Sequence, residues 1–181
     1  MASRIFSISW RRFCVLVASV LLVVAVVLAT AILQPRGDDP GVSDAVAVLG
    51  RSTPDRLATA QAIMAKGGAS ALVVSAYPPD LDGQVPPVCL TPQPYPVYCF
   101  NPVPATTQGE ARSLRRLAAE HQWRSIQVVT FRPQMERARL LIGRCYSGEL
   151  RMVDSGQEFN RVGNLVYQSG AFAKAVATPG C

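Results

Sequence analysis

The stretch VVTFRPQMERARLL, from Val128 to Leu141, decides the fold. It opens with two β-branched residues and Thr130, which are typical of the end of a buried strand. Pro133 then suits the first turn of a helix, and apolar side chains follow it at helical spacing. A strand that passes directly into a helix is the repeating unit of α/β proteins. The stretch therefore predicts a strand end and a helix from Pro133 to about Cys145.

The same alternation extends to both sides of this stretch. Strands are predicted in DAVAVLG, ALVVS, SIQVVT and ELRMVD, at Asp44–Gly50, Ala71–Ser75, Ser125–Thr130 and Glu149–Asp154. Further helices are predicted from Pro54 to the Gly67-Gly68 pair, over TTQGEARSLRRLAAEH (Thr106–His121), and from about Asn160 to Ala177. This alternation predicts a Rossmann-like three-layer α/β sandwich with a mostly parallel sheet. In such sheets ligands bind beyond the carboxyl ends of the strands.

An apolar run near the N-terminus predicts one transmembrane helix. Phe13 to Leu33 is interrupted only by Ser19 and Thr30, and it is long enough to cross the hydrocarbon core. The arginines in residues 1–12, without an acidic residue, place that flank in the cytoplasm and the rest of the chain outside. Ala29-Thr30-Ala31 also fits a signal-peptide cleavage site, but the run is long for one, which favours an anchor. The expected organisation is a flank over 1–12, a span over 13–33, a linker over 34–43 and a domain over 44–181.

The charge left for the exported domain is small. The chain carries a net charge of +6, and its cytoplasmic flank holds three arginines, Arg4, Arg11 and Arg12. The rest has 15 Lys and Arg against 12 Asp and Glu, a net charge of +3. Nucleic-acid-binding surfaces usually show a strongly basic stripe. We therefore expect no nucleic-acid partner.

Four cysteines follow the apolar run, while Cys14 lies within it. In an oxidising compartment four cysteines predict two disulfides, with three possible connectivities. We favour a short bridge inside a proline-rich loop and a second one that fastens the C-terminal segment to a helix end. The expected pairs are Cys89 with Cys99 and Cys145 with Cys181. A zinc site is the competing interpretation, but the chain has no CxxC pair and one histidine, so no metal is expected.

One connection is too long for a minimal strand–helix–strand unit. Residues 76–104 hold nine of the fourteen prolines and show little periodicity. Loops of this length in compact domains are usually functional or disordered, and the expected disulfide argues for order. The loop could form a lid over a site at the strand ends, or it could be a rigid surface excursion.

Polar residues gather where the predicted strands end and the helices begin. Gly50 would let backbone amides approach a ligand, and helix N-termini add positive potential. Arg56 and Arg137 lie near helix starts, where a guanidinium can bind phosphate or carboxylate in bidentate geometry. The candidate anion-binding residues are Gly50, Arg51, Arg56, Ser75, Thr106, Thr107, Glu110, Thr130, Arg132 and Arg137.

Several of these polar residues have a structural alternative. Thr107 and Glu110 have the spacing of a capping box, which alone would explain both. Structural or solvated roles are expected for Arg139, Arg144, His121 and Asp154. The sequence contains no GxSxG, GxxxxGK[ST] or GxGxxG motif, and no histidine stands beside a nucleophile. Neither catalysis nor a cofactor is therefore predicted.

The motifs DAVAVLG, ALVVS, TTQGEA and VVTFRPQMERARLL, in this order, resemble the YdcF/SanA/ElyC-like domain of bacterial envelope proteins. The resemblance runs from about Ser43 to Val153. It implies an N-terminal membrane helix, a Rossmann-like domain and work in the envelope: the permeability barrier, peptidoglycan and lipid-carrier metabolism, or S-adenosylmethionine binding. The matching positions are Gly50, Arg56, Ser75, Thr107, Glu110, Thr130, Arg137 and Ala138.

The chain departs from the family pattern at the end of the third predicted strand. Phe131 stands where the family has serine, and Gln134 stands where it has histidine; Ala76 and Tyr77 replace two glycines. Gln134 joins the candidate site, but glutamine does not exchange a proton near neutral pH. The resemblance thus implies binding of an anionic, phosphorylated envelope precursor or lipid carrier. The alternative is a non-catalytic interaction module of the envelope that uses the proline-rich loop.

Overall fold

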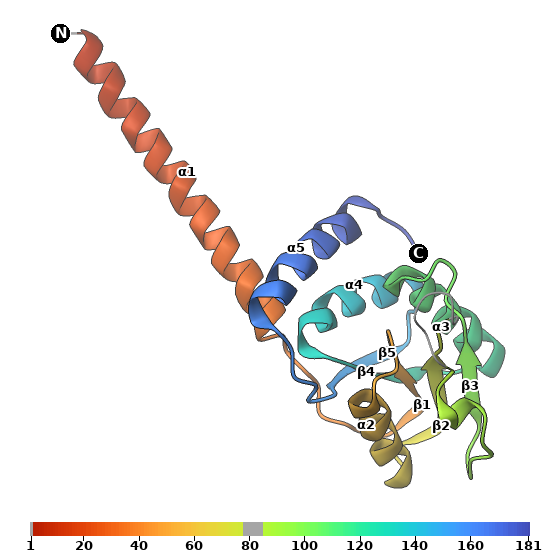
Figure 1. Cartoon of the computed structure of the whole chain (residues 1–181). Helices are drawn as coiled ribbons and strands as arrows, with labels where there is room; N and C mark the ends of the chain where they lie inside the picture. The colour runs from red at the N-terminus through yellow and green to blue at the C-terminus, as the bar shows by residue number, and fades with distance from the viewer. Residues whose placement is uncertain (1, 78–84) are drawn as a thin grey trace.

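The computed structural model describes residues 2–77 and 85–181 and forms an α/β domain behind a long N-terminal helix (Figure 1). Five parallel strands make one sheet in the order β3-β2-β1-β4-β5. The strands are β1 (Ser43–Val48), β2 (Ala69–Ser75), β3 (Val97–Phe100), β4 (Ser125–Thr130) and β5 (Glu149–Asp154). The helices are α1 (Ala2–Leu33), α2 (Pro54–Ala65), η2 (Pro87–Cys89), α3 (Thr107–His121), η3 (Arg132–Gln134), α4 (Met135–Cys145) and α5 (Arg161–Ala177).

The sheet is covered on both faces, which makes the predicted three-layer sandwich. Strand side chains alternate, so that Ala47 and Val128 face α3 and α4 while Val48 and Val129 face α2. Both sets are fully buried. Strands buried on both faces consist of nearly continuous apolar residues, as AVAV in β1 and ALVV in β2 do. The predicted fold class is confirmed.

The strand order reverses its direction next to β1. The chain adds β2 and β3 on one side of β1, and then crosses the sheet to add β4 and β5 on the other side of β1. In doubly wound sheets the crevice at such a switch point binds ligands. The carboxyl ends of β1 and β4 are therefore the expected position of a site.

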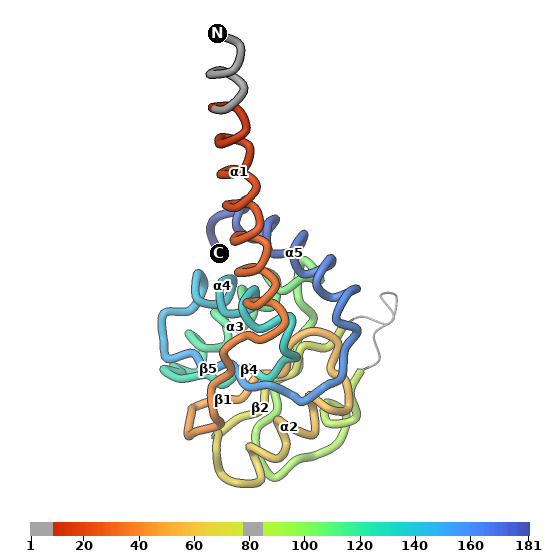
Figure 2. Tube along the Cα trace, turned by 90° about the vertical axis from the view of Figure 1, so that its left-hand side faces the viewer, coloured from red at the N-terminus to blue at the C-terminus, as the bar shows by residue number. Residues whose placement is uncertain are grey.

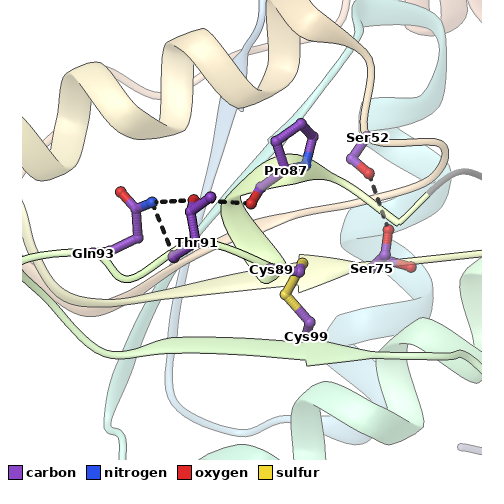
Figure 3. Close-up of a disulfide and its surroundings, with 7 residues drawn as sticks. All are labelled: Ser52, Ser75, Pro87, Cys89, Thr91, Gln93 and Cys99. Carbon is purple, nitrogen blue, oxygen red and sulfur yellow. Dashed lines mark hydrogen bonds between the residues drawn. A yellow bond between two sulfur atoms is a disulfide. The ribbon is translucent and has the colours of Figure 1, made fainter.

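The proline-rich segment contains a strand that the sequence pattern did not indicate. Val97–Phe100 forms β3, an edge strand parallel to β2, so the prediction of an ordered loop without a strand over 76–104 was wrong there. The strand was missed because it has four residues between prolines. Figure 3 shows the Cys89–Cys99 disulfide joining η2 to β3. Of its described residues, Val88, Cys89, Tyr95 and Val97 pack on the α2 face of the sheet, whereas Tyr98 and Phe100 pack on the face covered by α3 and α4. Residues 78–84, on which the lid interpretation also depends, lie outside the described residues.

α1 is one continuous helix whose segment Ser9–Leu33 is long and apolar enough to cross a membrane. This segment could serve as an anchor or as a signal sequence, and it begins four residues before Phe13, where the predicted span starts. Its last turn already touches the domain, since Ile32 is buried. The predicted linker is also fixed: Asp38 exchanges hydrogen bonds with the backbone of Met152 at 2.7 Å, and Gly41 exchanges them with Gln127. The domain therefore follows α1 without a free spacer.

α5 lies over α4 and beside the end of α1 (Figures 1 and 2). The Cys145–Cys181 disulfide joins the end of α4 to the segment after α5. Arg144 adds hydrogen bonds to the carbonyls of Ala175 and Thr178. Both predicted disulfides are thus present, and together they are consistent with an oxidising, extracytoplasmic environment.

Candidate functional site

A cavity of about 620 Å³ opens at the carboxyl edge of the sheet. It lies at the switch point predicted from the strand order, and α5 forms the wall opposite the strand ends. The segments after all five strands contribute to its lining: Gly50, Arg51, Thr53 and Arg56 after β1, Tyr77 after β2, Pro104 to Gln108 after β3, Phe131, Gln134, Arg137 and Leu141 after β4, and Gln157 after β5. α5 and its end add Asn164, Tyr167, Gln168, Ala171, Lys174, Ala175 and Thr178.

The turn after β1 requires glycine at position 50. Gly50 has φ = 67°, a left-handed conformation that glycine adopts without a steric penalty. A Cβ atom there would lie 2.5 Å from Nη1 of Arg56. The amide of Gly50 donates a hydrogen bond to Oε1 of Glu110. The backbone of this turn thus contacts Glu110 through its amide and approaches the Arg56 side chain, which a larger residue would displace.

Arg56 is held by three groups around the cavity. Its Nη1 donates to the carbonyl of Leu49 at 2.7 Å, and its Nε donates to Oε1 of Gln157 at 3.0 Å. The guanidinium also lies 4.7 Å from the ring centre of Phe131. Burial lowers the pKa of Arg56 to about 10, and the nearby Glu110 opposes this shift. Arg56 therefore stays cationic at neutral pH.

Arg137 belongs to a hydrogen-bonded chain that crosses the site. Thr130 donates to Gln134 at 3.1 Å, and Gln134 donates to Thr107 at 3.1 Å. Arg137 donates through Nη1 to Thr107 at 2.9 Å and through Nε to Gln168 at 3.0 Å. The chain therefore connects β4, η3, α3, α4 and α5, and it fixes the guanidinium of Arg137 against the cavity. Burial lowers the pKa of Arg137, and electrostatic interactions with the neighbouring Tyr167 and Glu110 oppose this shift.

The start of α3 adds further hydrogen-bond donors. Thr106 is the N-cap residue, because its hydroxyl accepts a hydrogen bond from the amide of Gly109. The hydroxyl of Thr107 already accepts two hydrogen bonds and donates none within the described parts of the chain, so its proton is available to a ligand. The first amides of a helix also lack intrahelical acceptors. The capping-box interpretation was wrong, because Glu110 binds the amide of Gly50 rather than closing the box.

Glu110 and Ser75 form a buried polar pair beneath the cavity. Both are completely inaccessible to solvent, and Oε2 of Glu110 and Oγ of Ser75 have no hydrogen-bond partner of good geometry among the described residues. Burial raises the pKa of the Glu110 carboxyl; the neighbouring Ser75 hydroxyl and the Gly50 amide oppose this shift, as do Arg56 and Arg137. The Ser75 hydroxyl thus lies close enough to the Glu110 carboxyl to favour its charged form, without a hydrogen bond of good geometry. The carboxyl therefore holds the turn through the Gly50 amide and interacts electrostatically with Arg56 and Arg137.

The lining of the cavity carries positive charge. Four cationic side chains contribute to it: Arg51, Arg56, Arg137 and Lys174. Among the described lining residues none is acidic. Tyr77 adds a phenolic donor, since burial raises its pKa to about 12. A concave site with cations, hydroxyls and amides but no exposed carboxylate is suited to an anion.

The structure brings together most of the predicted site residues. Gly50, Arg51, Arg56, Thr107, Gln134 and Arg137 line the cavity. Ser75, Glu110 and Thr130 are buried beneath it and act through their neighbours. Arg132 lies elsewhere: its exposed side chain pairs with Asp154, beside the linker rather than in the cavity.

Sequence reasoning missed the residues that α5 and the strand ends add. Lys174, Tyr167 and Gln168 reach the site only because α5 folds back over α4, and no local signal reveals that return. Tyr77 and Gln157 follow β2 and β5 closely, so their position at strand ends could have indicated them.

Arg139 and His121, which were expected to have structural roles, lie outside the cavity and make structural contacts. Arg139 binds Asp38 at 3.1 Å and the carbonyl of Arg36. His121 stacks on Trp123 with 5.0 Å between ring centres, away from the cavity. Within residues 2–77 and 85–181, no group of three His, Cys, Asp or Glu side chains comes together as a metal site would require.

No protein-family model, curated protein or solved structure matches this sequence.

Proposed function

We propose that this chain is a membrane-anchored, extracytoplasmic Rossmann-like domain that binds an anionic, phosphorylated envelope precursor or lipid carrier. The observation that carries the proposal is the charge of the cavity. Four cationic side chains line it without an acidic neighbour among the described lining residues, at the strand edge where such sheets bind ligands.

The donors suit phosphate oxygens more than a single carboxylate. Arg56 and Arg137 each use two nitrogens, Nε and Nη1, for protein contacts, which leaves Nη2 of both without a partner within the described residues. Two planar donors that line the same cavity, with the Thr107 hydroxyl beside Arg137, can satisfy several oxygens at once. A volume of about 620 Å³ leaves room for a group beyond the phosphate.

The residues favour binding over proton transfer. Gln134, in the position where the YdcF-like pattern has histidine, uses both ends of its amide to hold Thr130 and Thr107. An amide neither gains nor loses a proton near neutral pH. Glu110 is the buried titratable carboxyl of the site, and it lies beneath the lining. We therefore assign the cavity a binding role in the envelope.

The test measures Kd for the full-length protein in lipid nanodiscs. The probes are a polyprenyl phosphate, a polyprenyl pyrophosphate, a nucleotide sugar, inorganic phosphate and S-adenosylmethionine. Arg51→Gln and Lys174→Gln each remove an exposed charge from the lining without breaking a hydrogen bond described above. A hydrogen bond to a charged group contributes about 1.5–3 kcal/mol, so we expect each variant to bind the preferred phosphate at least about tenfold more weakly.

The matched control is Arg115→Gln, which removes the same charge from the exposed face of α3 outside the cavity. Its Kd should equal that of the wild type. An equal loss in Arg115→Gln would mean that the effect is non-specific attraction, and the proposed site would be wrong. If none of the phosphates binds, the interaction-module alternative replaces this proposal.

A further inference from the structure

Exposed apolar side chains outside α1 are concentrated on α5. Eight large hydrophobic side chains beyond α1 are exposed among the described residues, and half of them belong to this one helix. They are Val162, Val166, Tyr167 and Val176. Val162 and Val166 are 74% and 72% exposed and stand one turn apart, so they lie on the same face. Exposed apolar groups gathered on one helix indicate a surface that is covered in the functional state.

The position of α5 relative to α1 indicates what covers this face. α1 packs against α5 at its C-terminal end. In both views α5 lies on the side of the domain from which α1 leaves; it runs across the direction of α1 in Figure 1 and obliquely to it in Figure 2. A bilayer crossed by α1 would therefore have α5 as the nearest element of the domain, inclined to its surface rather than pointing into it.

The length of α1 places α5 at the level of the lipid headgroups. The 25 residues of Ser9–Leu33 form a helix of about 37 Å, compared with about 30 Å of hydrocarbon. About one turn therefore extends beyond the hydrocarbon into the headgroup region, and Ile32 in that turn is already buried against the domain. Residues 34–43 do not add a spacer, because Asp38 and Gly41 are bonded to β5 and β4.

We propose that α5 is an interfacial helix that lies on the bilayer surface with Val162 and Val166 among the lipid headgroups. Its composition fits this role: Arg161 and Lys174 are its charged residues, and it contains no acidic one. Interfacial helices combine an apolar face with basic residues that meet anionic lipids. Because Tyr167, Gln168 and Lys174 of the same helix line the cavity, the cavity opens beside the bilayer. The proposal rests on the membrane anchoring in the proposed function, but not on the ligand.

Quenching of tryptophan fluorescence by brominated lipid tests this placement. The full-length chain is reconstituted in nanodiscs made with or without a phosphatidylcholine brominated near the carbonyl end of its acyl chains. Val162→Trp and Val166→Trp each introduce a probe at an exposed position, so the fold is not disturbed. Gln61→Trp is the control, on an exposed position of α2, which lies at the far side of the domain from α1 (Figure 1). The signal of the wild type is subtracted, because Trp10 and Trp123 also fluoresce.

An interfacial helix inserts its apolar face about 5–10 Å, so brominated lipid should lower the emission of both α5 probes at least about twofold and leave the Gln61→Trp probe unchanged. Equal emission in the two kinds of nanodisc for the α5 probes would overturn the proposal. So would a blue-shifted emission without quenching, because the face would then be covered by protein, such as a second copy of the chain. Since no ligand is present, failure here leaves the proposed phosphate binding untouched.

Discussion

Breaking the Cys145–Cys181 disulfide removes the covalent link that holds the segment after α5 to the end of α4. The perturbation is the double substitution Cys145→Ser/Cys181→Ser. The bridged cysteines are 36 residues apart, and the loop-closure relation gives a loss of about 3.8 kcal/mol in the free energy of unfolding. For a chain of this size, that loss corresponds to a Tm lower by about 8–15 °C.

The second disulfide supplies the comparison. Cys89 and Cys99 are 10 residues apart, and the same relation gives about 2.7 kcal/mol for the double serine variant. Differential scanning fluorimetry of the full-length protein in detergent measures both, with mass spectrometry to confirm that the remaining disulfide is formed. We expect the Cys145→Ser/Cys181→Ser variant to be the less stable of the two and to bind phosphate more weakly, because α5 walls the cavity. If the Cys89→Ser/Cys99→Ser variant were the less stable, closure of the longer loop would not be the main contribution.

Two further predictions concern the residues beneath and beside the cavity. Burial raises the pKa of Glu110, so the folded state keeps this proton after the unfolded chain has lost it, and stability falls as pH rises above the usual 4.5 towards the folded pKa. The Glu110→Gln variant lacks this titrating group, so its free energy of unfolding relative to the wild type should rise by up to about 1.4 kcal/mol per pH unit across that interval. Parallel urea titrations of the two proteins between pH 4.5 and 8 measure this difference. A difference that stayed constant with pH would refute the prediction. Gly50→Ala should lower the free energy of unfolding by about 1–2 kcal/mol because alanine is strained in the left-handed conformation, and by a further amount because its Cβ displaces Arg56. Gly156 also has a left-handed backbone, with φ = 69°, but a Cβ there would meet no atom within 4 Å. Gly156→Ala should therefore show the backbone cost alone. Equal losses in the two alanine variants, measured by urea unfolding, would show that the contact with Arg56 has no energetic weight.

The strands and most helices could be predicted because each has its own local signal. The apolar runs of β1 and β4 are bounded by glycine or by a helix start, and Pro54 stands at the beginning of α2. Residues at the strand ends then follow from the parallel topology, which is why Gly50 and Arg137 were found. Arg132 was misplaced because the side chain of a residue just past a strand can turn to either side. Here Asp154 draws it away from the cavity.

The remainder of the site depends on packing that no local pattern encodes. Thr107 was predicted as a site residue, with a capping role as the structural alternative. Thr106, one residue earlier, is the cap, so the hydroxyl of Thr107 is free to bind Arg137. The wall formed by α5 is determined by contacts between residues far apart in the sequence. Arg137 and Gln168 are 31 residues apart, as are Arg144 and Ala175. Such contacts become visible only once the helices are packed.

These long-range contacts make α5 the element on which the width of the cavity depends. The strand ends are fixed by the sheet, whereas α5 is held by the bonds of Arg137 and Arg144, by the disulfide at Cys145 and by the end of α1. A displacement of α5 would break the bond between Arg137 and Gln168 and move Lys174, but it would leave Arg56 and the turn at Gly50 in place. In the two proposals made above, ligand binding and membrane position therefore act on the same helix. Through Gln168, a shift of α5 at the bilayer would reach the guanidinium of Arg137 without any change in the sheet.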